Sequence, residues 1–179
     1  DLPLNISREM LQQSPLIAKI RSGTVNRLLK ELKNRSKDYD DYKKFWDAFG
    51  IAFKEGIYED FANRTEIAEL SRFYSTKDPE RLTSLDEYIS RVQPEQKAIY
   101  YITGDDVKTL VNNPQLEAFK AKGIEVLLLV DPIDEFWTQT LLNYKDFAIK
   151  HISPRAETGG AESRRGRFEK TDRFDERNV

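Results

Sequence analysis

Apolar residues recur at helical spacing through the first part of the chain. Ser14 and Pro15 are typical of an N-cap and a first helical residue. The apolar stripe that follows them consists of Leu16, Ile17, Ile20, Val25, Leu28 and Leu32. This spacing predicts a long amphipathic helix.

A second stripe is unusually aromatic. Its members are Tyr42, Phe45, Trp46, Phe49 and Phe53. Gly56 follows them and is expected to end the helix as its C′ residue. A shorter helix fits residues 64–72, so the pattern predicts a three-helix coil over residues 14–72.

From about residue 73 the pattern changes to strands that alternate with helices. Ser84 and Glu87 have the spacing of a capping box at the start of a helix. Three apolar runs, KAIYYIT, IEVLLLV and FAIKHI, are predicted strands, and continuous runs of this kind are typical of buried parallel sheets. Gly123 closes the helix before the second run, and Asp131 with Pro132 is expected to begin the helix after it.

The predicted fold class is therefore α/β. A three-helix coil is followed by a small α/β/α layered subdomain, residues 73–152, with a mainly parallel sheet. Residues 1–13 are expected to be a loop segment from a preceding subdomain. Residues 153–179 are rich in mixed charge and almost without aliphatic residues, which predicts a disordered polar tail.

Composition excludes several kinds of site. The 29 basic and 31 acidic residues give a net charge of −2, so neither nucleic acid nor a membrane is an expected partner. The chain has no cysteine and a single histidine, His151, which argues against a zinc site or a Ser-His-Asp triad. No metal site is expected, and no apolar run approaches the roughly 20 residues of a membrane span.

The turns after the first two predicted strands do not resemble phosphate loops. Their sequences are TGDD and DPIDE, which are acidic and lack a lysine. We therefore expect no nucleotide or other cofactor to bind to this chain by itself, and no enzyme activity from it alone.

Four separated motifs resemble one known family. DLPLNISREMLQQ, FKEGIYED, SLDEYISRV with QKAIYYITGD, and EVLLLVDPIDEFW are similar, in this order, to the middle domain of the ninety-kilodalton heat-shock chaperones, bacterial HtpG type. The resemblance covers about residues 1–150 and implies the later portion of that domain. It implies a cytoplasmic, homodimeric chaperone that assists protein folding, hydrolyses ATP with Mg and works with co-chaperones, whereas this chain alone is expected to be monomeric.

The resemblance also assigns a role to an arginine at an unusual place. Arg8 follows the expected N-cap Ser7, where the helix dipole disfavours a cation. In the family the matching arginine reaches the γ-phosphate of ATP held by the N-terminal domain. Gln12 matches a glutamine that supports this catalytic loop, and Asn5 is expected to help position it.

The resemblance further implies a client-binding surface on the helix after DPID. The residues expected there are Glu135, Phe136, Trp137 and Gln139. Adjacent helical residues lie about 100° apart, so we expect one of the two aromatic residues to be exposed. Two alternatives remain at this stage: a stand-alone small-molecule enzyme with a site above the sheet, and a purely structural interaction domain.

Overall fold

The computed structural model describes residues 14–152. The predicted opening segment and polar tail lie outside these residues. The first half of the described chain consists of α2 (Pro15–Arg35), α3 (Tyr39–Glu59) and α4 (Arg64–Leu70). Ser14 is the N-cap of α2 and Pro15 its first residue, as predicted. No helix within the described range is long and apolar enough to cross a membrane.

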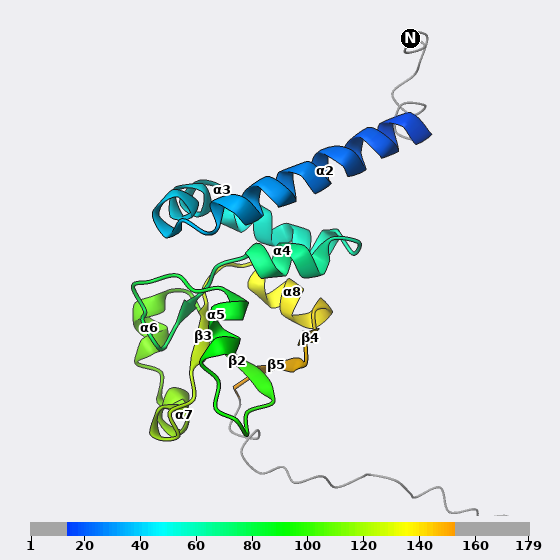
Figure 1. The fold of residues 1–179 in the computed structure, drawn as a ribbon. Helices are drawn as coiled ribbons and strands as arrows, with labels where there is room; N and C mark the ends of the chain where they lie inside the picture. Colours follow the sequence, from blue (N-terminus) through cyan, green and yellow to red (C-terminus); the bar gives the residue numbers. More distant parts are fainter. Residues whose placement is uncertain (1–13, 153–179) are drawn as a thin grey trace, which may run out of the picture.

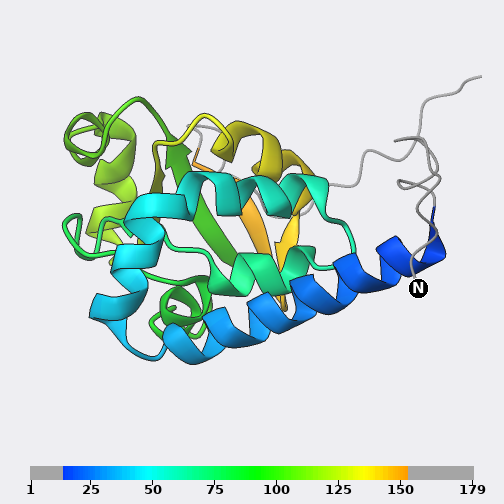
Figure 2. The same ribbon diagram turned by 90° about the horizontal axis from the view of Figure 1, so that it is seen from above.

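Only the second half of α2 packs against the body of the molecule. Figure 1 shows its first half extending away from the other elements, and Figure 2 shows it running along one side of α4 and beyond. Leu29 and Leu32 are buried, whereas Leu16, Ile20 and Leu28 are exposed. The predicted stripe was therefore wrong at these three positions. Leu16 and Ile20 lie on the half of the helix that extends away from the body, and Leu28 lies about 100° around the helix from the buried Leu29.

Gly56 does not end α3, so that prediction was also wrong. The helix continues to Glu59, and the Gly56 carbonyl accepts a hydrogen bond of 3.0 Å from the amide of Asp60. A Cβ atom on Gly56 would lie 2.9 Å from Cδ1 of Ile67. The glycine thus permits α3 and α4 to approach closely.

The second half of the chain forms a five-stranded sheet with short helices. The strands are β1 (Tyr74–Ser75), β2 (Ala98–Thr103), β3 (Val126–Leu129), β4 (Asn143–Tyr144) and β5 (Phe147–His151). Their order is β1-β3-β2-β5-β4; the three central strands are parallel, and the two edge strands are antiparallel to their neighbours. The mainly parallel α/β sheet is confirmed, although the two-residue edge strands were not predicted.

Along the chain, the helices of this half fall between successive strands. They are α5 (Leu85–Ser90), α6 (Val107–Val111), the 3-10 helix η1 (Pro114–Leu116), α7 (Glu117–Ala121) and α8 (Asp134–Thr140). The capping box at α5 is present, since the Ser84 hydroxyl accepts a hydrogen bond from the Glu87 amide and the Glu87 carboxylate accepts one from the Ser84 amide. Gly123 adopts a φ of +66°, as expected of a residue that closes a helix.

Strand β3 contributes to two hydrophobic cores. Leu127 and Leu129 pack in the core that also contains residues of α3, α4 and α8, whereas Val126 and Leu128 pack in the core beneath α6 and α7. Alternate residues of a strand point to opposite faces, so both faces of the sheet are covered. The continuous apolar run is a consequence of this layered arrangement.

Candidate functional site

The predicted site residues fall into two groups. Asn5, Arg8 and Gln12 lie outside the described residues. Glu135, Phe136, Trp137 and Gln139 all belong to α8, where the structure describes their surroundings.

The two adjacent aromatic residues of α8 have opposite environments. Phe136 is 52% exposed, whereas Trp137 is 0% exposed. Glu135 and Gln139 are exposed beside Phe136. The expectation that one aromatic residue is exposed is therefore confirmed, but Trp137 is inaccessible to a client and has to be removed from the predicted surface.

Helix α8 begins later than the sequence indicated. Asp131 is not its N-cap and Pro132 is not its first residue, because residues 131–133 form a turn and the helix starts at Asp134. The amide of Asp131 donates to Oδ2 of Asp134 at 3.0 Å, and the amide of Asp134 donates to the carbonyl of Asp131 at 2.9 Å. These two hydrogen bonds connect the turn at residues 131–133 to Asp134, the first residue of the helix.

A buried ion cluster lies beneath α8. The Nζ atom of Lys54, on α3, is 2.5 Å from Oδ2 of Asp131 and 2.7 Å from Oδ1 of Asp134. Trp137 donates its indole N–H to the same Oδ1 atom at 2.6 Å. Lys54 also lies 5.4 Å from the centre of the Phe73 ring. We call Lys54, Asp131, Asp134 and Trp137 the Lys54 cluster.

The Lys54 cluster connects two helices that are far apart in sequence. Lys54 and Asp134 are both buried and are separated by 80 positions. Buried charges require partners, and within residues 14–152 no buried side-chain nitrogen or oxygen lacks a hydrogen bond. The cluster therefore fixes the position of α8 on α3.

An aromatic pair lies on the outer side of α8. The rings of Phe136 and Tyr58 have centroids 6.0 Å apart and planes at 66°, which is an edge-to-face contact. Tyr58 lies on α3 and is itself exposed. The side-chain amide of Gln139 donates to the carbonyl of Glu135 at 2.7 Å. The result is a small apolar surface with a polar rim, held on a rigid base.

The acidic turns at the ends of β2 and β3 have structural roles. Asp106 caps α6 by accepting hydrogen bonds from the amide and hydroxyl of Thr109, and these bonds hold the pKa of its carboxyl below the usual value. Asp134 belongs to the Lys54 cluster. Neither turn carries a basic side chain, and the carboxylates of both would repel a phosphate, so the described residues at this edge do not fit ATP.

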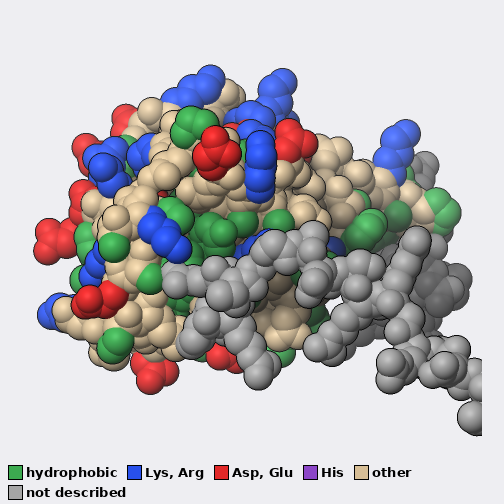
Figure 3. All heavy atoms as spheres, turned by 90° about the horizontal axis from the view of Figure 1, so that it is seen from below, with side chains coloured by type: hydrophobic (Ala, Val, Ile, Leu, Met, Phe, Trp, Pro, Cys, Tyr) green, Lys and Arg blue, Asp and Glu red, His purple; other side chains and the backbone are tan. Residues whose placement is uncertain are grey.

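One face of the described surface has no dominant charge. Figure 3 shows basic and acidic side chains interspersed over one face. Within residues 14–152 there is no group of three or more His, Asp or Glu residues that could hold a metal ion.

Comparisons with known proteins give a consistent result. A family model described as "Hsp90 protein" matches residues 1–174. The chain is 57% identical over 150 residues to the chaperone protein HtpG of Paramagnetospirillum magneticum, a match that covers 82% of this chain and 24% of the relative. It is 51% identical over 156 residues to the HtpG of Methylorubrum populi, covering 86% and 25%. The chain thus spans about a quarter of the length of these relatives.

A solved structure agrees with these matches. The middle domain of a Plasmodium falciparum heat shock protein is similar with a TM-score of 0.73 and 35% sequence identity, over 78% of this chain and 60% of that one. The likeness extends the sequence match to the arrangement of helices and strands.

Proposed function

Because this chain belongs to the Hsp90 protein family, we propose that it forms the later part of the middle region of an ATP-dependent chaperone that assists protein folding. Its relatives named chaperone protein HtpG and the similar middle-domain structure support this proposal. In the intact protein we expect ATP and Mg to bind to a separate N-terminal domain, since the described strand-end turns do not fit a nucleotide.

The observation that carries the client-binding part of the proposal is the exposed Phe136 beside Tyr58. An apolar surface with a polar rim provides affinity for partly unfolded polypeptides and leaves the free protein soluble. The Lys54 cluster holds α8 from beneath, so little conformational entropy is lost when a client docks. Glu135, Phe136 and Gln139 are the proposed contacts.

The second part of the proposal concerns the opening segment. We infer that Arg8 donates hydrogen bonds to the γ-phosphate of ATP when the N-terminal and middle regions close on one another, with Gln12 and Asn5 supporting its loop. A guanidinium group can neutralise charge that develops on phosphoryl oxygens during transfer. This chain therefore supplies one group to the ATPase reaction and carries no complete active site.

The proposed partners follow from the family. They are the N-terminal ATP domain of the same protein, partly folded clients, co-chaperones and, in the intact protein, a second copy that forms a homodimer in the cytoplasm. The chain by itself is expected to be monomeric.

Client binding can be tested with Phe136→Ala in the intact chaperone. We expect the affinity for a partly unfolded client, measured by fluorescence anisotropy, to fall about fivefold or more, because central exposed aromatic residues dominate interface energies. The matched control is Phe49→Ala, since Phe49 on α3 is also an exposed phenylalanine, at 61%, and stacks on Phe45. Melting temperature and ATP turnover should stay near wild type in both variants. Equal client affinities for the two variants would rule out Phe136 as a contact.

A further inference from the structure

A small basic cleft lies where the turn between α2 and α3 meets the segment around β1. Four basic residues and one acidic residue line it: Lys37, Lys43, Arg72, Arg81 and Glu87. We propose that this arginine cleft is a binding site for a phosphate group. The two arginines are its central ligands, and the lysines lie at its ends.

Arg72 has donors that no described residue uses. Its Nη1 atom donates to the carbonyls of Leu70 at 3.0 Å and Ser71 at 3.1 Å, while the guanidinium lies 4.5 Å from the centre of the Tyr42 ring. Among the described residues, Nε and Nη2 have no hydrogen-bond acceptor, and Glu87 and Asp86 act on the group through their charge without forming an ion pair with it. Burial lowers the pKa of Arg72, although the nearby Tyr42 and Glu87 oppose this effect. A bound anion would offset the cost of partly burying the Arg72 charge and would accept hydrogen bonds from its unused donors.

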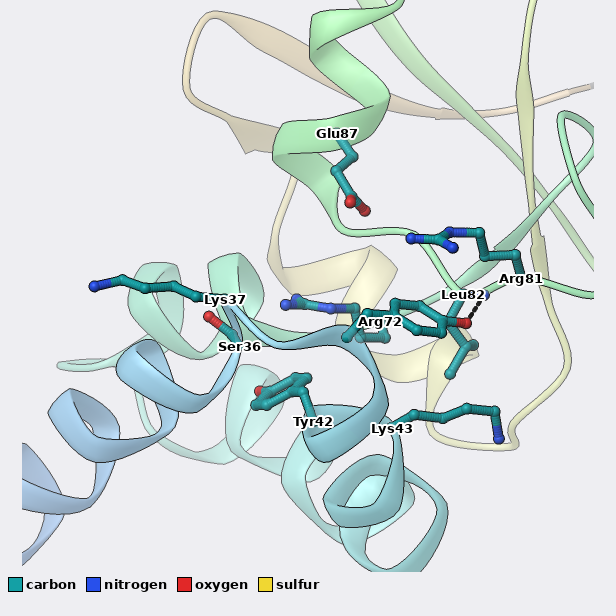
Figure 4. A pocket seen from close by; sticks show the side chains of 9 residues that line it. Ser36, Lys37, Tyr42, Lys43, Arg72, Arg81, Leu82 and Glu87 are labelled. Atoms are coloured by element: carbon teal, nitrogen blue, oxygen red, sulfur yellow. Dashed lines mark hydrogen bonds between the residues drawn. The ribbon is translucent and has the colours of Figure 1, made fainter.

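Arg81 lines the same cleft and also lies over a tyrosine ring. Its guanidinium is 4.1 Å from the centre of the Tyr39 ring, and the Tyr39 hydroxyl accepts a hydrogen bond of 3.2 Å from the amide of Leu82. Figure 4 shows the two guanidinium groups extending in the same direction below Glu87, while the ammonium groups of the lysines point outward. Stacking on two tyrosine rings thus preorganises two adjacent forks that can each bind phosphate oxygens.

Glu87 does not neutralise the cleft. Its carboxylate accepts hydrogen bonds from the Ser84 amide at 2.8 Å and from the Thr83 hydroxyl at 3.1 Å. Burial would raise the pKa of Glu87, but these two bonds and the charges of Arg72 and Arg91 outweigh burial and lower it. Glu87 is therefore charged and is used by the capping box of α5. Lys43 pairs with Asp47 at 2.6 Å, so the surplus of positive charge in the cleft comes from Lys37 and the two arginines.

The size of the cleft selects the ligand. Its volume is about 160 Å³, whereas small-molecule pockets typically have about 300–1,000 Å³. One tetrahedral oxyanion fits this space and a whole nucleotide does not. The phosphate group can be free in solution or part of a phosphorylated side chain, because the arginines would make the same contacts in both cases.

The test is a titration of the full chain with inorganic phosphate at constant ionic strength, followed by amide chemical shifts in NMR. We expect saturable shifts at Ser36 and Leu82, with a dissociation constant in the millimolar range or tighter. Arg81→Gln should weaken binding about tenfold, because it removes a charge-assisted bidentate contact. The matched control is Lys150→Gln, which removes one exposed positive charge on β5 and should leave the affinity unchanged. Arg81 is exposed, so an unchanged melting temperature will verify the fold.

Titrations with peptides distinguish free phosphate from a phosphorylated side chain as the ligand. A phosphoserine peptide that binds more tightly than inorganic phosphate identifies a phosphorylated polypeptide as the ligand, and equal affinities identify the free anion. Shifts that do not saturate, or that are equal in Arg81→Gln and Lys150→Gln, would overturn the proposal. Tighter binding of a glutamate peptide than of both phosphate ligands would also overturn it.

Discussion

Replacing Lys54 with methionine is expected to lower the free energy of unfolding by about 3–5 kcal/mol, because the substitution leaves two carboxylates beneath α8 without their cation. Asp134 is completely buried, so water cannot replace the lost ammonium group there. The measurement is urea unfolding followed by circular dichroism, with the slope compared between variants. The expected loss is a large part of the stability of an ordinary domain.

A matched control exists on the same helix. Lys43 pairs with Asp47 at 2.6 Å, but the Lys43 side chain is 43% exposed whereas that of Lys54 is 4% exposed. Lys43→Met should therefore leave stability almost unchanged, since solvent screens an exposed pair. Adding Asp134→Asn to Lys54→Met should restore part of the loss. If Lys54→Met and Lys43→Met have the same effect, the Lys54 cluster does not hold α8 in place.

The second large effect is expected for Arg8→Ala in the intact chaperone. ATP turnover should fall by between about tenfold and 10³, the upper value being typical of arginine fingers in other phosphoryl-transfer proteins. Slow closure between domains reduces the loss if closure and not chemistry limits the rate. ATP affinity should change much less, because the contact is proposed for the closed, reactive state. Steady-state turnover and equilibrium ATP binding are the two measurements.

Two further variants make this test specific. Arg8→Lys keeps the charge but loses the planar fork, so turnover should stay well below wild type. Arg27→Ala removes an exposed arginine from α2 and should leave turnover unchanged. Gln12→Ala is expected to reduce turnover in the same direction as Arg8→Ala but more weakly. Normal turnover of Arg8→Ala at saturating ATP would rule out the proposed role.

The sequence correctly predicted those helix ends that are stabilised by residues close to one another along the chain. The capping box of α5, the N-cap of α2 and the left-handed Gly123 each involve residues within a few positions of one another, and all three are present. The continuous apolar runs also identified the three central strands. Edge strands of two residues have no pattern long enough to be recognised.

Errors arose where distant segments decide the conformation. Gly56 has the chemistry of a helix end, but a side chain of α4 packs against it and the helix continues. The start of α8 was misplaced because the Asp134 carboxylate turns back to the Asp131 amide and pairs with a lysine 80 positions away. The bond between Asp131 and Asp134 spans only three positions, but the contacts with Ile67 and Lys54 come from separate helices and have no signature in the local sequence.

Lys54 itself was missed for a related reason. The predicted aromatic stripe of α3 included Phe49, which is exposed, whereas the buried positions are Tyr42, Trp46, Gly50, Lys54 and Ile57. Phe45 and Trp46 are adjacent and point to different faces of α3, so both faces appear equally apolar in the sequence. Lys54 follows Gly50 by four residues and Trp46 by eight, a spacing that places all three on one face of the helix. This spacing was the signal that could have identified Lys54.

Because the first half of α2 extends away from the body, a small rotation of this helix produces a large displacement of its first turn. Its 21 residues correspond to about 30 Å, and the distance from Leu29 to the first turn is about 20 Å, at 1.5 Å per residue. A rotation of about 5° at Leu29 moves the first turn by about 2 Å, and displacements of about 1 Å are large for catalytic geometry. The packing of Leu29 and Leu32 on the body thus sets the direction in which the first half of α2 extends.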